Sequence, residues 1–219
     1  MTVLEVPDDA LEALPVFPLP QVTLFPGARL PLHIFEPRYR KMTSDCLAGH
    51  RAMAVTQLLG PGQGGTDPPI AIVAGVGMVV EAEPLPDGRF NLVLEGCARV
   101  RLFELPFVAP YRRARALLLG ELLSEPAGAE VAALSATARA FVAFVRARDP
   151  DFRFVVPEAG LPGPRLADLC AQRLILDASD RQSALELLDP AARVCFVRDV
   201  LAGQLARLGG RSGPSAGAN

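Results

Sequence analysis

The spacing of apolar positions divides the chain into two parts. From Leu14 to Leu119, apolar residues come in short runs separated by proline and glycine, a pattern typical of β-strands. From Ala127 to Leu208, apolar residues recur at helical spacing. The pattern therefore predicts an α+β fold, in which a strand-rich part is followed by a helical part.

Seven strands are expected in the first part, in a curled or barrel-like sheet. They are Leu14–Phe17, Ala28–Ile34, Ala52–Leu58, Ile70–Glu83, Arg89–Glu95, Ala98–Leu105 and Tyr111–Leu119. Pro31 predicts an edge strand, because proline cannot donate to a β-ladder. Pro86-Asp87-Gly88 predicts a hairpin turn, and Gly96 predicts either a bulge or a second tight turn. The one helix expected here is Pro37–Ala48, closed by Gly49.

The second part is expected to form a small bundle of three or four helices. The first helix carries the spacing Val131, Leu134, Ala138, Phe141 and Val145 and ends near Asp149-Pro150, and the next is Leu166–Leu174. Ser179-Asp180 is the expected N-cap of Arg181–Leu188, and Asp189-Pro190 opens the last helix.

These patterns predict four segments. An amino-terminal extension covers residues 1–12, a β-barrel subdomain covers 13–120, and a helical bundle covers 127–208. The remaining residues, 209–219, are rich in Gly, Ser and Ala and are expected to form a disordered tail.

Composition and charge narrow the function classes. The net charge of −2 and the pI of about 5.8 argue against a general nucleic-acid binder, which needs a surplus of basic side chains. The longest apolar run, Ile70–Val80, is too short to cross a bilayer, and the start of the chain does not resemble a secretory signal. A cytoplasmic protein is expected.

Candidate chemistry is sparse. Cys46, Cys97, Cys170 and Cys195 form no CxxC pair and are expected to be reduced, mostly buried thiols. With His33 and His50 added they still assemble no metal cluster at ligand spacing, so neither a metal nor another cofactor is expected. The glycine-rich stretch Gly60–Gly65 lacks the GK[ST] ending of a phosphate-binding loop and is interpreted as a flexible connector.

Some charged and polar side chains are assigned structural roles. His33 lies in an apolar run and is interpreted as a partly buried histidine. Glu36 and Arg38 are expected to help fix the start of the helix Pro37–Ala48. Several arginines of the last two predicted strands could form a basic patch, but a solvated face balanced by glutamates is favoured. The arginines are Arg99, Arg101, Arg112, Arg113 and Arg115, and the glutamates are Glu81, Glu83 and Glu95.

The order of several motifs resembles the amino-terminal domain of Lon proteases. Leu14-Pro-Val-Phe-Pro-Leu19, Leu24-Phe-Pro-Gly27 and Leu30-Pro-Leu-His-Ile-Phe-Glu36 resemble its opening. Further matches are Pro86-Asp-Gly88, Val93-Leu-Glu-Gly96, Arg99-Val-Arg101, and Leu166-Ala-Asp168 followed by Gln182, Leu185, Glu186, Asp189 and Arg193, with Ala184 and Val194 standing where leucine is usual. The resemblance covers Leu14 to Leu208 and implies a PUA-like pseudo-barrel followed by a helical bundle.

The resemblance implies binding rather than catalysis. The chain has no GxxxxGK[ST] motif for an ATPase. Gly213-Pro-Ser-Ala-Gly217 resembles the segment around the family's catalytic serine, but a serine nucleophile needs a nearby base, and Lys41, on an early helix, is the only lysine. No catalytic residue is therefore predicted.

The leading hypothesis is a module that binds exposed apolar segments of unfolded polypeptides, with a protease or chaperone ATPase as a partner in trans. The candidate contact residues are Leu24, Phe25, Leu30, Leu32 and Phe35, which crowd around turns. The alternative for each is a place in the barrel core. An RNA- or small-ligand-binding protein and a structural adaptor stay open as other functions, and self-association stays open as well.

Overall fold

The computed structural model describes residues 5–60, 68–157 and 160–210. The chain divides into two compact units, Met1–Glu121 and Leu122–Asn219. Most of the predicted connector Gly60–Gly65, and all but the first two residues of the predicted tail, lie outside the described residues.

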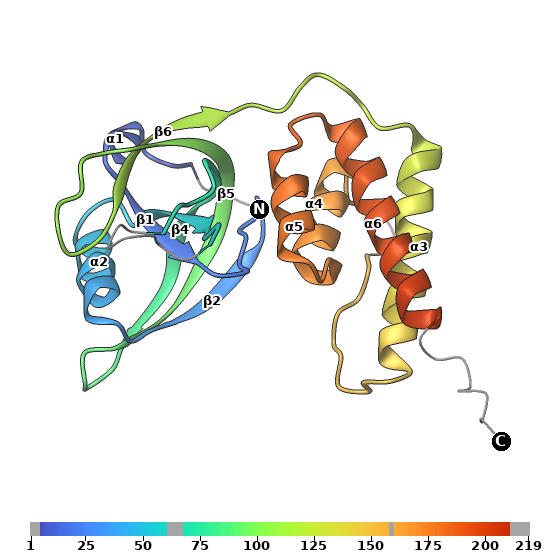
Figure 1. Ribbon diagram of the computed structural model, residues 1–219, viewed down its shortest axis with the longest axis horizontal. Helices are drawn as coiled ribbons and strands as arrows, with labels where there is room; N and C mark the ends of the chain where they lie inside the picture. Colours follow the sequence, from blue (N-terminus) through green and yellow to red (C-terminus); the bar gives the residue numbers. More distant parts are fainter. Residues whose placement is uncertain (1–4, 61–67, 158–159, 211–219) are drawn as a thin grey trace. The chain divides into compact units, whose positions relative to one another are not determined.

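The first unit is a strand-rich barrel (Figure 1). Its elements in chain order are α1 (Asp8–Glu12), β1 (Leu14–Leu19), β2 (Arg29–Ile34), α2 (Pro37–Ala48), β3 (Ala52–Gln57), β4 (Val73–Pro84), β5 (Phe90–Glu104) and β6 (Arg113–Leu119). The strand order is β2-β5-β4-β3-β1-β6, and an added β5–β6 pairing closes β1, β3, β4, β5 and β6 into a ring. β2 lies at the open end of this order, as Pro31 predicted. With the helical second unit, this confirms the α+β prediction.

The length of β5 makes the ring possible. Residues 90–95 pair with β2, and residues 99–104 pair with β6. The two strands expected at Arg89–Glu95 and Ala98–Leu105 are therefore one strand. Against β4, the register passes from Gly96 to Ala98 and skips Cys97, so the predicted interruption at Gly96 is a bulge.

The turn between β1 and β2 fills the barrel interior. Leu24 and Phe25 are fully buried, and their main chain crosses strand positions occupied by glycine. A Cβ at Gly75 would come within 1.9 Å of the Leu24 carbonyl oxygen, and one at Gly96 within 2.1 Å of the Phe25 carbonyl oxygen. Gly96 also exchanges main-chain hydrogen bonds with this segment, donating to Ala28 and accepting from Gly27. Only glycine lets the backbones approach so closely.

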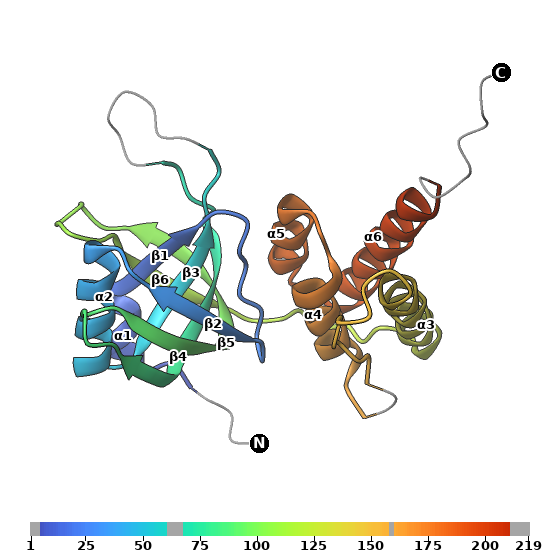
Figure 2. The ribbon, with the colours of Figure 1, turned by 90° about the horizontal axis from the view of Figure 1, so that it is seen from below.

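Local predictions in this unit have mixed outcomes. The helix α2 has the predicted bounds and lies against β1 and β2 (Figure 2), and the Pro86-Asp87-Gly88 turn joins β4 to β5. The segment 1–12, expected only as an extension, contains the short helix α1. Burial of Ala10 among the barrel's apolar residues holds α1 against the barrel.

The second unit is a bundle of α3 (Gly128–Arg146), α4 (Gly163–Leu174), α5 (Ala178–Glu186) and α6 (Pro190–Gly210). α3 contacts α4 and α6. The last helix opens as predicted, because Asp189 Oδ1 accepts from the amides of Ala191 and Ala192. The N-cap of α5 is Asp177 rather than Ser179-Asp180, since its carboxylate accepts from the amides of both those residues.

Length and composition alone make α3 the one helix, among the described residues, that could span a membrane. The longest apolar run in the sequence, Ile70–Val80, lies outside α3 and therefore did not single out this helix. The buried residues of α3 are Leu134, Ala138, Phe141 and Val142, on the side that packs in the bundle.

Candidate functional site

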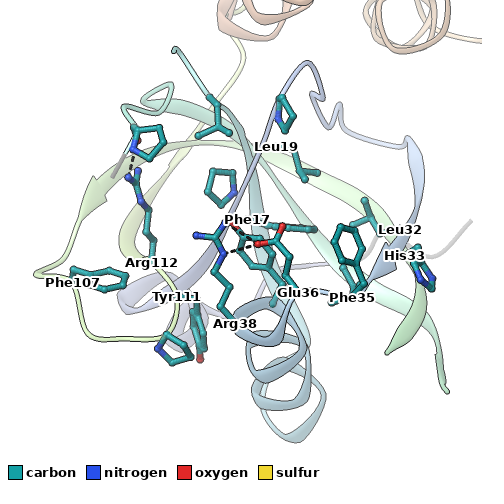
Figure 3. Close-up of a pocket in the computed structure, with 17 residues that line it drawn as sticks. Phe17, Leu19, Leu32, His33, Phe35, Glu36, Arg38, Phe107, Tyr111 and Arg112 are labelled. Carbon is teal, nitrogen blue, oxygen red and sulfur yellow. Dashed lines mark hydrogen bonds and ion pairs between the residues drawn. The ribbon is translucent and has the colours of Figure 1, made fainter. Parts of the chain in front are cut away.

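A groove of about 360 Å³ opens on the barrel unit between the ends of β1 and β2. Figure 3 shows Phe17 and Leu19 from β1, and Leu32, His33 and Phe35 from β2 and the residue after it. The start of α2 and the loop between β5 and β6 complete the walls. The lining residues are Phe17, Pro18, Leu19, Pro20, Leu32, His33, Ile34, Phe35, Glu36, Arg38, Tyr39, Leu58, Pro68, Phe107, Pro110, Tyr111 and Arg112.

Two aromatic rings form part of the groove and anchor it to the barrel. The rings of Phe17 and Tyr39 are tilted against each other with centroids 4.5 Å apart, and both side chains are buried. The guanidinium carbon of Arg38 lies 4.5 Å from the centroid of the Tyr39 ring, a cation–π arrangement. These contacts fix a rigid apolar surface inside the groove.

Charged groups lie at the sides of the groove and are paired locally. Arg38 Nε donates to Glu36 Oε2 at 2.9 Å. Arg112 Nη2 donates to the Pro68 carbonyl at 2.7 Å, and Arg112 Nη1 lies 3.4 Å from Glu104 Oε2. Glu36 occupies the N-cap position of α2 without a side-chain cap bond, so it contributes to this helix start through Arg38 and not by capping the amides.

The loop after β5 is held against α2 by a polar cluster. The Tyr111 hydroxyl donates to Asp45 Oδ2 at 2.8 Å and accepts from Arg113 Nη2 at 3.2 Å, and Asp45 also pairs with Lys41. The hydrogen bond from Lys41, followed by that from Tyr111, lowers the pKa of Asp45 despite an opposing effect of burial. Burial raises the pKa of Tyr111, and its bond to Asp45 adds to the rise. The cluster thus positions Phe107 and Pro110 on one wall.

The five predicted contact residues separate into three groups. Leu24 and Phe25 have no exposed surface and do not line the groove, because they fill the barrel interior over Gly75 and Gly96. Leu30 is half-buried on β2, outside the groove lining. Leu32 and Phe35 do line it, and the Phe35 side chain is 61% exposed. Of the five, only Leu32 and Phe35 lie where a groove ligand could contact them.

The groove also contains residues that the sequence did not single out. Tyr39 was assigned to a helix face, and Phe107 lies in the loop after β5, 72 positions beyond Phe35 in the chain. The pairing of β6 with both β5 and β1 brings this loop to the groove. The available signal in the sequence was the apolar run Leu105 to Val108 just before a predicted strand. In the structure, Leu105, Phe107 and Val108 are exposed.

The histidines have ordinary structural partners. His33 is exposed rather than partly buried, since odd positions of β2 face outward; its Nδ1 lies 2.8 Å from Asn91 Oδ1 and its Nε2 3.2 Å from Arg89 Nη1. His50 Nδ1 accepts from the Ala52 amide. Within the described ranges, no group of three or more His, Cys, Asp or Glu side chains is arranged to hold a metal.

The arginines of β5 and β6 form no uniform patch. Arg99 is buried and lies 3.5 Å from Glu121, and Arg112 pairs with Glu104. Glu81, one of the glutamates expected to balance them, pairs instead with Arg29. The glutamates that pair with Arg99 and Arg112 are thus Glu121 and Glu104, which the sequence did not single out, and the buried Arg99 does not belong to a solvated face.

A family model for the ATP-dependent protease La (LON) substrate-binding domain matches residues 13–202. The chain belongs to the LON substrate-binding domain family. Its relatives include the Lon protease of Trichlorobacter lovleyi, 31% identical over 199 residues, and the Lon protease of Roseiflexus castenholzii, 30% identical over 191 residues. These matches cover 87% and 86% of this chain but only 24% of each relative, so the chain spans about a quarter of their length.

Solved structures show that this LON domain shares the family's fold. The Lon N-terminal domain protein from Xanthomonas campestris has a TM-score of 0.63 at 20% identity, covering 87% of this chain and 97% of its own. The N-terminal domain of a Mycobacterium avium complex Lon protease has a TM-score of 0.62 at 15% identity, covering 87% and 98%. The resemblance drawn from the motifs is confirmed.

Proposed function

We propose that the chain binds exposed apolar polypeptide segments in the groove between β1 and β2. The single observation that carries this proposal is the groove itself, with Phe35 and Phe107 exposed by 61% and 59% on its walls. Such aromatic side chains lose water-exposed area when a client side chain packs between them. The family description as a substrate-binding domain supports the same proposal.

The size of the groove limits the kind of client. A volume of about 360 Å³ accommodates a few side chains and is near the lower end for small-ligand sites. A folded surface would not reach the buried pair Phe17 and Tyr39, whereas an unfolded segment can place single side chains there. The client is therefore an unfolded or locally exposed segment, selected for apolar side chains.

Action with a protease or chaperone ATPase belongs to the same proposal. Curated relatives named Lon protease carry this domain within chains about four times its aligned length. By holding an unfolded segment, the present chain delivers it to such a partner in trans. Catalysis in this scheme belongs to the partner, and this chain supplies the recognition surface.

The test is retention of reduced, carboxymethylated α-lactalbumin, a permanently unfolded protein, on the immobilised chain. Phe35→Ala and Phe107→Ala together are expected to weaken binding at least about tenfold, since truncated aromatic anchors typically lose more than 1 kcal/mol each. Phe103→Ala is the matched control, because Phe103 is 44% exposed on β5 outside the groove. Equal retention by wild type and the double variant, with both folded, would overturn the assignment of the groove.

A further inference from the structure

The groove coincides with a gap in the barrel where two strands each have an open edge. β2 pairs with β5 alone, and β1 pairs with β6 only at Leu14 and Pro15. Beyond those positions, no strand among the described residues pairs with the side of β1 away from β3, or with the outer side of β2. The groove is lined from both strands (Figure 3). Open strand edges are templates for a further strand.

The main-chain groups that β2 offers to the gap follow from its register. Gly96 donates to the Ala28 carbonyl, so even positions of this segment form the hydrogen-bonded pairs with β5. The main-chain groups of Arg29, Pro31 and His33 then point away from β5, toward the open side. Proline has no N–H, so His33 is the residue nearest the groove that offers both a donor and an acceptor.

The edge of β1 offers acceptors only. The Val16 amide donates to Arg112 on the β6 side, while the Leu19 carbonyl accepts from Leu58 on the β3 side. Even positions of β1 therefore face the gap, and after Val16 the even position within β1 is Pro18. Because neither Pro18 on β1 nor Pro31 on β2 can donate, the two strands cannot close the gap by pairing with each other along this stretch.

We propose that the polypeptide bound in the groove is an extended segment that enters this gap as an additional strand, antiparallel to β2. Its main chain exchanges two hydrogen bonds with His33 and donates one to the Pro31 carbonyl. The inference rests on the proposed function and specifies how the client is held. An extended peptide is the occupant because the open edges present main-chain donors and acceptors in strand geometry next to an apolar surface.

Strand geometry fixes which client residues do what. Residues opposite one another across an antiparallel pair project to the same face. The client residues that bond to His33 and Pro31 therefore share the face of these two exposed side chains, of which only His33 also lines the groove, and can be polar. The alternate residues project with Leu32 and Ile34 into the groove, and must be apolar. Main-chain groups of these apolar residues face β1, which offers the Pro18 carbonyl.

The test uses a fluorescent peptide, Ser-Leu-Thr-Leu-Lys-Leu-Ser, and measures its Kd by anisotropy on the full chain. His33→Pro removes the donor but keeps the edge geometry, and His33→Thr is the reference for loss of the side chain alone. His33→Pro is expected to bind at least about fivefold more weakly than His33→Thr, the effect of about one hydrogen bond. Thermal unfolding of both variants checks that the barrel remains folded.

Peptide variants test the same geometry without changing the protein. N-methylation at Thr and Lys removes the donors that face β2 and is expected to weaken binding at least about tenfold. N-methylation of the second and third Leu removes the donors that face β1 and is expected to weaken it about fivefold or less, because that edge has a single carbonyl to lose.

The outcomes separate this inference from the proposed function. Equal binding by His33→Pro and His33→Thr, with no difference between the two N-methylated peptides, would overturn strand addition, while loss in the Phe35 and Phe107 variant would still support the groove. A third outcome is a concentration-dependent dimer that His33→Pro dissociates and that the peptide does not disrupt. This outcome would assign the β2 edge to a second copy of the chain, and it would also overturn the proposal.

Discussion

Arg193 Nε lies 3.0 Å from Asp168 Oδ1 inside the helical unit, with both side chains almost completely buried. Arg193 also donates from Nη1 to the Leu187 carbonyl, so the guanidinium joins α4, α6 and the end of α5. Both residues belong to the motif pattern by which the sequence resembles Lon domains. Their role is therefore structural.

Asp168→Ala is expected to destabilise the helical unit by about 3–5 kcal/mol, because it leaves a buried guanidinium without its counter-charge. Urea unfolding followed by circular dichroism measures the change. Replacing both residues together, Asp168→Leu with Arg193→Met, should be far less harmful, since no charge is left buried. A single variant as stable as wild type would contradict the importance of the pair.

Phe25→Ala and Phe35→Ala are expected to differ in kind. The buried Phe25 ring leaves a cavity when removed, so Phe25→Ala should lower the free energy of unfolding by about 3–5 kcal/mol. Phe35 is mostly exposed, and its truncation should change stability by about 0.5 kcal/mol or less while weakening client binding. Chemical denaturation and the α-lactalbumin assay together separate the two effects. The reverse pattern would return Phe25 to the binding surface.

Gly96→Ala is expected to destabilise the barrel by about 1–3 kcal/mol or more, because the new Cβ meets the Phe25 carbonyl oxygen. Gly120→Ala is the matched control, since no atom lies within 4 Å of its added Cβ. The shift in thermal midpoint should be large for Gly96→Ala and within error for Gly120→Ala. Similar midpoints for both would show that the turn can move away from β5.

Asp45 predicts an acid-dependent loss of stability. A carboxylate whose pKa is lower in the folded state adds stability above its unfolded pKa, here near 3.8, and loses that contribution as the pH falls through the folded value. The thermal midpoint of wild type should exceed that of Asp45→Asn at pH 7, and the difference should shrink below about pH 4. A difference that stays constant from pH 7 to pH 2.5 would argue against the ion pair with Lys41.

Cys46 and Cys170 are expected to resist alkylation in the folded protein. Burial raises the pKa of each thiol to about 12, and the thiolate is the reactive form. Iodoacetamide at pH 8, with mass spectrometry of the peptides, should modify both only after unfolding. Rapid modification of Cys170 in native conditions would mean that the bundle opens locally.

Much of the fold followed from local pattern. The bounds of α2 were predicted because Pro37 and Gly49 mark both ends, and the hairpin between β4 and β5 followed from its turn residues. Pairing between strands that are far apart in the sequence could not be predicted from such patterns. That β5 is one strand shared by two partners depends on the closure of the ring, which no local signal encodes.

The candidate site shows the same limit. Phe25 and Phe35 look alike in the sequence, as aromatic residues near turns. Their different burial depends on glycines at positions 75 and 96, at least 40 residues further along the chain, which let the turn that carries Phe25 enter the barrel. Phe107 reached the groove only through strand pairing. Apolar patterning could therefore propose a set of contacts but could not divide it into interior and surface.

The prolines at the two open strand edges have a consequence for the proposed binding and release of a peptide strand. Pro18 on β1 and Pro31 on β2 leave a slot open between the two strand edges, and the ring of five strands is closed without it. In the proposed complex, a guest strand would enter and leave while the barrel keeps its architecture, so capture and release would need no refolding. A binding protein built in this way could cycle repeatedly, and the same prolines disfavour edge-to-edge pairing between its own copies.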